Sequence, residues 1–240
     1  MAKPKAAFYW AASCGGCEIT VTELFMRLIT VGELVDIVFW PCTMDFKYQD
    51  VEDMADGEID VTFFNGAIRT EENEHLAKLL RKKSKVLVAF GSCAYEGCIP
   101  ALANLFSADS IMKRVYEEVP TLDGEPTAGT LPAPVTKVPE GEVFLPKFYD
   151  QVKTLAQTVD VDYYMPGCPP VVEQVWKVLN VILEGKLPPK GSVIGVDPKT
   201  NCDECPRIKV EPGMRIAEFK RPHEVELDPD LCFLAQGVLC

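Results

Sequence analysis

The stretch Ala6-Ala7-Phe8-Tyr9-Trp10-Ala11-Ala12-Ser13-Cys14-Gly15-Gly16-Cys17 places two thiols where an apolar first strand is expected to end. Two later apolar runs finish in the same way, at Gly91-Ser92-Cys93 and at Pro166-Gly167-Cys168. Ligands of parallel sheets bind outside the carboxyl ends of the strands. The sequence therefore predicts that three strands deliver four cysteines to one edge of a sheet, namely Cys14, Cys17, Cys93 and Cys168.

The rest of the chain alternates between apolar runs and amphipathic stretches, which predicts strands separated by helices. The predicted strands are 6–10, 34–40, 61–65, 85–90 and 161–165, with a short one in 190–197. The predicted helices are 18–29, 71–82, 100–105, 110–119, 148–159 and 170–184. Strands joined by such helices form a mainly parallel sheet with helices on both faces. We therefore expect an α/β fold with a doubly wound sheet.

Composition narrows the possible classes of protein. The 240 residues are 48% hydrophobic and 25% charged, which suits a globular protein, and the length suits one large α/β domain or one medium domain plus an extension. No apolar run approaches the roughly 20 residues that span a bilayer, and the start resembles no secretory or twin-arginine signal, so we expect a cytoplasmic protein without membrane insertion. The net charge of -12 argues against nucleic-acid binding. Ten cysteines in a reducing compartment indicate metal ligation or redox chemistry.

The composition changes at Pro188, after which prolines are frequent and helical periodicity is lost. This tail is too poor in apolar residues to form a large core, and metal ligation stabilises small segments of this kind. We expect a domain of residues 1–187 and a cysteine-rich segment of residues 188–240, which contains Cys202, Cys205, Cys232 and Cys240. The proline- and glycine-rich stretch 120–146 is expected to be a surface excursion, with a partner-docking loop as the alternative.

The number and spacing of the cysteines suit iron–sulfur clusters, because thiolate is a soft ligand and a four-iron cubane takes four cysteines. A C-x2-C pair holds two corners of a cubane, and the glycines between permit close approach of the backbone. One alternative is a thioredoxin-like dithiol at Cys14 and Cys17. Another is a zinc site in the tail, although the spacing from Cys232 to Cys240 is longer than that of usual zinc ligands.

Two further cysteines lie near the predicted sheet edge. Cys98 competes with Cys93 for the third ligand position, and Cys93 is preferred because it follows its strand immediately. Cys42 follows the second strand and is expected to be a buried thiol and not a ligand, since free cysteine is among the most buried residue types. Such a thiol is still able to pack near the cluster.

Three segments in order, Cys14-Gly15-Gly16-Cys17-Glu18, Gly91-Ser92-Cys93-Ala94 and Pro166-Gly167-Cys168-Pro169-Pro170, resemble the proximal-cluster motifs of [NiFe] hydrogenase small subunits. The run from Gly91 to Pro100 is especially similar to the cytoplasmic F420-non-reducing (methyl viologen-reducing) hydrogenase small subunits of methanogens and some bacteria. The resemblance covers most of the chain. It implies a flavodoxin-like domain in which Cys14, Cys17, Cys93 and Cys168 hold a proximal [4Fe-4S] cluster.

The resemblance also implies a second, distal [4Fe-4S] cluster in the tail. Cys202 and Cys205 lie where many relatives have a His-x2-Cys pair, and Cys232 and Cys240 complete the set. Relatives with three clusters continue with further cysteines, whereas this sequence stops at Cys240. We therefore expect two [4Fe-4S] clusters in the chain as given, and a third if the natural chain continues past a truncated end.

The implied function is electron transfer without bond chemistry in this chain, so no catalytic residue is predicted. Electrons from H2 oxidation would pass from the NiFe centre of a separate large subunit, through the clusters, to an electron-accepting adaptor or a heterodisulfide reductase. One alternative is the cluster-bearing subunit of a complex I-like or energy-converting complex. It is disfavoured because complex I relatives carry adjacent cysteines at the first site, while small energy-converting forms lack the tail cysteines. A metal-stabilised structural adaptor is an alternative of another class.

Overall fold

The structure, a computed structural model, describes residues 3–121, 131–197, 199–209 and 218–240. The chain divides into two compact units, Met1–Val196 and Asp197–Cys240, each of which is described by itself. Among the described residues, no helix is both long enough and apolar enough to cross a bilayer.

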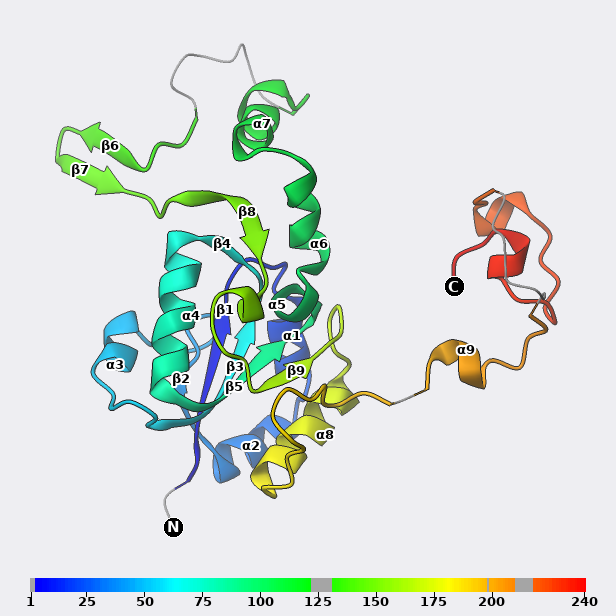
Figure 1. The fold of residues 1–240 in the computed structure, drawn as a ribbon, viewed down its shortest axis with the longest axis horizontal. Helices are drawn as coiled ribbons and strands as arrows, with labels where there is room; N and C mark the ends of the chain where they lie inside the picture. Colours follow the sequence, from blue (N-terminus) through cyan, green and yellow to red (C-terminus); the bar gives the residue numbers. More distant parts are fainter. Residues whose placement is uncertain (1–2, 122–130, 198, 210–217) are drawn as a thin grey trace. The chain divides into compact units, whose positions relative to one another are not determined.

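A parallel sheet in the strand order β2-β1-β3-β5-β9 forms the centre of the first unit (Figure 1). The strands are β1 (Lys5–Trp10), β2 (Asp36–Phe39), β3 (Ile59–Asn65), β5 (Ser84–Phe90) and β9 (Tyr163–Met165). The chain leaves β1 first toward β2 on one side and later continues through β3 on the other. This order is flavodoxin-like and doubly wound, which confirms the predicted fold class.

Helices cover both faces of the sheet because apolar side chains of β1 alternate between them. Ala6 and Phe8 belong to one core layer, and Ala7 and Tyr9 belong to the other. The first layer also contains residues of α1 (Gly16–Thr22), α2 (Arg27–Leu34) and α8 (Val172–Leu183). The second contains residues of α3 (Tyr48–Glu52), α4 (Glu71–Lys83), α5 (Ser92–Glu96) and the 3-10 turn η3 (Leu155–Gln157). A sheet buried on both faces explains the nearly continuous apolar runs.

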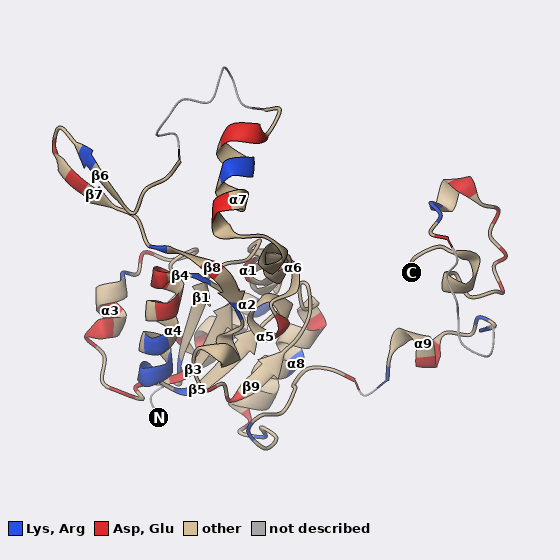
Figure 2. Cartoon of the chain, turned by 45° about the horizontal axis from the view of Figure 1, so that its top comes forward, with Lys and Arg blue, Asp and Glu red and all other residues tan. Residues whose placement is uncertain are grey.

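Helix α4 shows how local sequence fixes the ends of an element. The hydroxyl of Thr70 accepts a hydrogen bond from the backbone N–H of Asn73 at 3.3 Å, and the Asn73 side chain accepts one from the N–H of Thr70 at 3.2 Å. Acidic residues occupy the first turn and basic residues the last (Figure 2). The two side-chain bonds cap the start of the helix. Negative charge at the start of a helix and positive charge at its end both interact favourably with the helix dipole, which accounts for the basic residues that end at Lys83.

The predicted helix 18–29 is interrupted, so that prediction is wrong in its middle. Helix α1 ends at Thr22, whose hydroxyl donates to the carbonyl of Ile19 at 2.7 Å. Phe25 then adopts a positive φ of 49°, which an L-residue rarely occupies inside a helix. Helix α2 starts afresh at Arg27, and apolar spacing alone did not reveal this break.

The predicted helix 148–159 is also wrong, because residues Phe148–Lys153 form strand β8. This strand pairs antiparallel with β4 (Ile68–Thr70), far away in sequence. The η3 turn follows this strand. A short amphipathic segment can form either a helix or a strand, and here the hydrogen bonds to β4, which is distant in sequence, select the strand.

The region between β5 and β8 consists of short helical turns and a hairpin. The predicted helices 100–105 and 110–119 correspond to α6 (Cys98–Ala101), η1 (Leu102–Leu105), α7 (Ala108–Lys113) and the π-helical turn η2 (Arg114–Glu118). In the predicted excursion, strands β6 (Val135–Val138) and β7 (Gly141–Phe144) pair as an exposed hairpin (Figure 1). Residues 122–130 of this excursion lie outside the described part.

Two predictions about the end of the first unit have simple outcomes. The stretch 190–197 contributes an isolated parallel bridge between Val193 and Tyr164 and not a full strand. The predicted helix 170–184 is present as α8.

The second unit has little regular structure. It contains α9 (Asn201–Glu204) and the 3-10 turns η4 (Pro222–Glu224) and η5 (Leu234–Gln236). A parallel bridge joins Ile208 to Leu231, and the N–H of Cys232 donates to the carbonyl of Ile208 at 2.9 Å. This unit agrees with the predicted irregular cysteine-rich segment.

Candidate metal centre

The loops after β5 and β9 are joined directly by hydrogen bonds at the carboxyl edge of the sheet. The N–H of Gly91 donates to the carbonyl of Met165 at 2.7 Å, and the N–H of Ser92 donates to the carbonyl of Gly167 at 2.9 Å. In return, the N–H of Gly167 donates to the Ser92 hydroxyl at 3.1 Å. These bonds fix the backbone beside Cys93 relative to the backbone beside Cys168.

The loop after β1 reaches the same place and packs against the other two. A Cβ at Gly91, which has a φ of 83°, would collide with Cys17 Sγ, so this thiol lies directly on glycine backbone. A Cβ at Gly16 would lie 3.4 Å from Cys14 Sγ and 3.6 Å from the Pro169 ring. The close approach of Cys17 to the loop after β5 therefore depends on the absence of a side chain at Gly91, whereas a Cβ at Gly16 would make only ordinary contacts.

The thiols of these loops interact electrostatically. Burial first, and then the nearby Cys93 and Cys14, raise the pKa of Cys17 to about 12. Burial first, and then Cys98 and Cys168, raise the pKa of Cys93 to about 11. Buried thiolates close together repel one another, and a bound metal centre relieves this repulsion because it supplies positive charge.

Exposure is graded across the group. Cys17 and Cys93 are buried at 6% and 7% exposure, whereas Cys14 and Cys168 are exposed. The site therefore has a closed side within the sheet edge and an open side at the surface of this unit.

Cys98 belongs to the same group of thiols. Its side chain is half-buried, and its closeness raises the pKa of the thiols of Cys93, where burial is the larger cause, and of Cys168. The structure thus brings five cysteines together where four were predicted as ligands. Both candidates for the third ligand position are present.

A buried carboxylate beside the first loop was not singled out from the sequence. Glu18 is 5% exposed and accepts hydrogen bonds from the indole N–H of Trp40 at 2.6 Å and from the amide of Asn65 at 3.4 Å. The Asn65 side chain in turn accepts a bond from the Ser13 hydroxyl at 3.2 Å. This network braces both ends of the loop that carries Cys14 and Cys17. The feature of the sequence that could have revealed this buried carboxylate is a charged residue directly after Cys17, in a helix whose other side chains are largely buried.

The prediction that Cys42 is a buried thiol is wrong. Cys42 is exposed, because the indole of Trp40 takes the buried position at this turn with 3% exposure. The Cys42 thiol donates to Glu18 Oε2 at 3.5 Å. It therefore lies beside the brace of the first loop and outside the group of five thiols.

The donor chemistry of these residues fits an iron–sulfur cluster. Within the described ranges, no three His, Cys, Asp or Glu side chains are placed so that they could hold one metal ion. Soft thiols from three loops, with glycine backbone facing them, have the donor chemistry that such a cluster requires.

The four predicted ligands of the tail lie in the second unit with different surroundings. Cys232 is buried next to the Ile208–Leu231 bridge, and Cys205 is half-buried, while Cys202 and Cys240 are exposed. The backbone N–H and then the side chain of Arg207 hydrogen-bond Cys205 and lower the pKa of its thiol. A stabilised thiolate at Cys205 fits a metal ligand, and the complete set of four stays a prediction.

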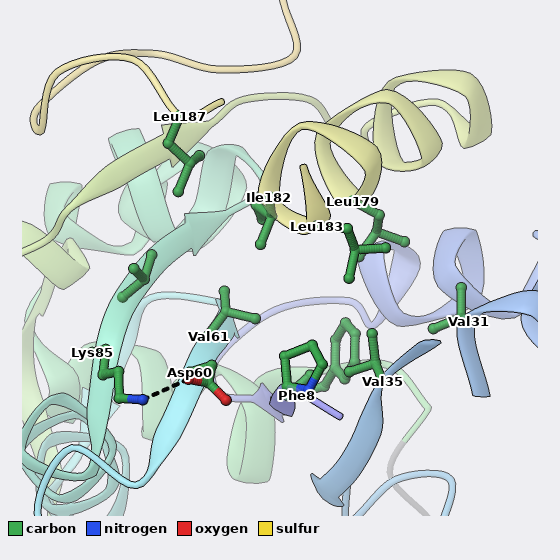
Figure 3. A pocket seen from close by; sticks show the side chains of 13 residues that line it. Phe8, Val31, Val35, Asp60, Val61, Lys85, Leu179, Ile182, Leu183 and Leu187 are labelled. Atoms are coloured by element: carbon green, nitrogen blue, oxygen red, sulfur yellow. Dashed lines mark hydrogen bonds and ion pairs between the residues drawn. The ribbon is translucent and has the colours of Figure 1, made fainter. Parts of the chain in front are cut away.

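A separate apolar cavity of about 330 Å³ lies at the other end of the strands. Phe8, Val61 and Lys85 line it from the sheet, and side chains of α2 and α8 line it from the helices (Figure 3). The ammonium of Lys85 pairs with Asp60 at 2.7 Å beside it. No cysteine is among the described residues that line this cavity, so it is distinct from the candidate metal centre.

The chain is similar in sequence to known proteins. Residues 14–182 match the family described as NADH ubiquinone oxidoreductase, 20 Kd subunit. An F420-non-reducing hydrogenase iron-sulfur subunit of Archaeoglobus profundus is 41% identical over 240 residues, covering 98% of this chain and 74% of that protein. An F420-non-reducing hydrogenase subunit of Methanothermobacter marburgensis is 33% identical, covering 99% of this chain and 70% of that protein.

A solved structure is similar over most of this chain. A chain of the NAD+-reducing [NiFe]-hydrogenase in the H2-reduced state has a TM-score of 0.65 and 29% sequence identity. The match covers 78% of this chain and 94% of that chain.

Proposed function

This chain belongs to the NADH ubiquinone oxidoreductase 20 Kd subunit family and, within it, to the small subunits of the F420-non-reducing hydrogenases, and on that premise we propose that it relays electrons through iron–sulfur clusters. It is a subunit of an oxidoreductase. In the proposal, electrons from H2 oxidation enter from a large subunit that carries the NiFe centre. The H2-activating site belongs to that partner chain.

The observation that carries the proposal is the gathering of thiols from three loops at one sheet edge. Cys14, Cys17, Cys93 and Cys168 are the proposed ligands of a proximal [4Fe-4S] cluster. A bound cluster of this kind supplies one-electron oxidation and reduction. The backbone hydrogen bonds between the loops after β5 and β9 hold two of the ligands in place before any partner binds.

The residues of this chain have distinct proposed tasks. Cys17 and Cys93, which are buried, keep water from the inner side of the cluster. Cys14 and Cys168, which are exposed, face the partner from which electrons arrive. Glu18 fixes the first loop through its bonds to Trp40 and Asn65.

A large-subunit surface next to the cluster is supported by exposed apolar side chains. Directly after Cys98, four large apolar residues of α6, η1 and the following turn are between 57% and 76% exposed, namely Ile99, Leu102, Leu105 and Phe106. Clusters of exposed apolar side chains are typical of surfaces that bind another protein. A partner on this surface would also cover the open side of the thiol group.

The proposal for the second unit rests on the chemistry of its cysteines. Cys202, Cys205, Cys232 and Cys240 are the proposed ligands of a distal [4Fe-4S] cluster, within the segment 188–240 that follows the cluster domain 1–187. Arg207 beside Cys205 supports the assignment, because it stabilises a thiolate there. A third cluster is proposed only if the natural chain continues.

The proposed acceptor is an electron-accepting adaptor or a heterodisulfide reductase, and the proposed compartment is the cytoplasm. Neither nucleic acid nor direct insertion into a membrane has a place in this function.

The test is a count of iron and acid-labile sulfide per chain, with EPR of the reduced state, on anaerobically purified protein. We expect about eight irons per chain, and about four in a Cys17→Ser variant, since each cubane contains four. The variant should also stop H2-dependent dye reduction by the assembled enzyme. Full iron content and full activity in Cys17→Ser would overturn the proximal assignment, and about four irons in the parent chain would overturn the distal one.

A further inference from the structure

The two residues between Cys14 and Cys17 are both glycines, so the local sequence gives this loop little stiffness of its own. Glycine loses more conformational freedom on folding than any other residue. Gly15 has a left-handed φ of 82° and forms the N-cap of α1, where no side chain in the described part of the chain caps the helix. The spacing of the two thiols therefore depends on contacts from outside the glycine pair.

The indole of Trp10 makes such a contact. A Cβ added at Gly15 would lie 2.7 Å from Cζ2 and 2.9 Å from Cη2 of this indole, which is closer than side-chain atoms approach, so the ring rests directly on the glycine backbone. The indole N–H donates a hydrogen bond to the carbonyl of Ser13 at 3.2 Å. One side chain thus contacts the residue before Cys14 and the residue after it.

Trp10 is itself held by the sheet. It is the last residue of β1 and lies opposite Asn65 of β3 in the parallel register. The Asn65 side chain accepts a hydrogen bond from the Ser13 hydroxyl at 3.2 Å, and that hydroxyl accepts one from the N–H of Gly15 at 3.3 Å. An indole has only two rotatable side-chain bonds, so it packs at a low cost in conformational entropy. The end of β1 therefore provides a stiff support for the loop.

The indole is not part of the buried core. Trp10 is 45% exposed, whereas Phe8 of the same strand is 2% exposed. Truncation of Trp10 therefore removes the contact with the loop and leaves the two core layers intact. This separation makes the role of the contact measurable.

We propose that Trp10 is a positioning residue, which holds Cys14 and Cys17 at the spacing of cluster ligands and so slows the loss of the proximal cluster. The inference rests on the proposed function. Groups that orient metal ligands from behind typically contribute about 10–100-fold to metal affinity. Glu18 braces the helix that follows Cys17, whereas Trp10 supports the loop between the two thiols.

The test is the rate of iron release to a ferrous-iron chelator from the anaerobically purified, assembled enzyme, for the parent, Trp10→Ala and Trp10→Phe. In Trp10→Ala about four irons per chain are released about tenfold faster or more, while the thermal unfolding midpoint of the loaded enzyme stays unchanged. Trp10→Phe keeps an aromatic ring beside Gly15 and loses the N–H bond to Ser13, so its rate lies between the other two. An unchanged rate in Trp10→Ala would overturn the proposal. Faster release together with a lowered unfolding midpoint would also overturn it, because the role would then be one of general stability.

A double-mutant cycle isolates the contact between Trp10 and Gly15. Gly15→Ala places a methyl group against the indole and should also speed the release of iron. When Trp10→Ala is combined with Gly15→Ala, the methyl group has room, so the acceleration is smaller than the product of the two single effects. Effects that simply multiply would show that the two residues act independently, and this would overturn the proposal.

Trp176→Phe is the matched control for Trp10→Phe. The Trp176 indole lies under the guanidinium of Arg27, 5.3 Å from its carbon to the ring centroid, and belongs to α8. We expect the parent rate of iron release in this variant. Equal acceleration in Trp176→Phe and Trp10→Phe would overturn the proposal, since loss of any indole would then suffice.

Failure of the proposed function looks different from failure of this inference. A parent enzyme without a reducible cluster at Cys14, Cys17, Cys93 and Cys168 would contradict the function itself. A normal parent cluster whose iron release ignores Trp10 would contradict the inference alone.

Discussion

Arg81 Nη1 lies 2.6 Å from Asp162 Oδ2, and this ion pair joins the end of α4 to the segment that leads into β9. The same carboxylate accepts the N–H of Leu87 at 2.8 Å, and its other oxygen pairs with Lys190 at 2.5 Å. Asp162 is 6% exposed. Burial opposes ionisation, but the bonds from Arg81, Lys190 and Leu87 outweigh it and hold the pKa of Asp162 below its usual value.

Asp162→Asn should lower the free energy of unfolding at neutral pH by about 1.5–3 kcal/mol, the range for hydrogen bonds to charged groups. Because the folded pKa is lowered, the stabilisation is complete above the unfolded value of about 3.9 and is lost as the pH falls through the folded value. The difference between parent and variant should therefore be constant from pH 7 to about pH 5 and shrink below about pH 3.9. Urea unfolding followed by tryptophan fluorescence measures it. Asp45→Asn, in an exposed pair with Lys47, should change stability very little at any pH.

Gly91→Ala should abolish the proximal cluster. The added methyl group would collide with Cys17 Sγ, and the φ of 83° is unfavourable for alanine. We expect a loss of about four irons per chain in elemental analysis. Gly191→Ala is the matched control, because Gly191 has a φ of 87° with nothing within 4 Å of the added atom. Equal iron loss in both variants would mean that backbone strain, and not contact with the thiol, is responsible.

Leu105→Asp should weaken the association with the large subunit by about tenfold or more, since a charge would enter an apolar contact. Leu105 is 76% exposed in η1, so the substitution leaves the core of this chain intact. Co-purification of the two subunits at graded protein concentration measures the effect. Leu34→Asp serves as the control, because Leu34 is exposed at the end of α2, just before β2 begins and hence toward the opposite edge of the sheet. An unaltered association in Leu105→Asp would remove this surface from the proposed interface.

Cys42→Ala should leave the iron content unchanged and alter stability by no more than about 0.5 kcal/mol. The thiol is exposed, and its contact with Glu18 is long at 3.5 Å. Iron and sulfide analysis beside a thermal unfolding scan is sufficient. Any loss of iron would place Cys42 in the cluster site, against its position in the structure.

The sequence predicted correctly those elements whose structure follows from the local pattern of apolar and polar residues. The apolar run ending at Trp10 formed β1, and the cysteines after the predicted strands lie at the carboxyl edge of the sheet. The alternation between strands and helices was enough to indicate the parallel sheet. In such a sheet every strand is buried, so its sequence is distinctive.

The parts that sequence pattern did not reveal depend on distant partners or unusual dihedral angles. Phe148–Lys153 became a strand because β4 pairs with it. Cys98 lies beside Cys168 and has a positive φ, and the residues next to it in the sequence do not predict this conformation. Glu18 is buried only because Trp40 and Asn65 surround it with donors. Each case is a tertiary interaction that overrides local propensity.

The position of β9 at the edge of the sheet sets an order of assembly. Its pairing with β5 is what brings Cys168 to the other thiols, and it is the last strand of the sheet to leave the ribosome. Long-range parallel pairings form slowly, because the intervening loop must close first. A nascent chain that ends before β9 therefore lacks Cys168, one of the four proposed ligands. The proposed proximal cluster would then be inserted only after β9 has paired with β5 and the sheet has closed.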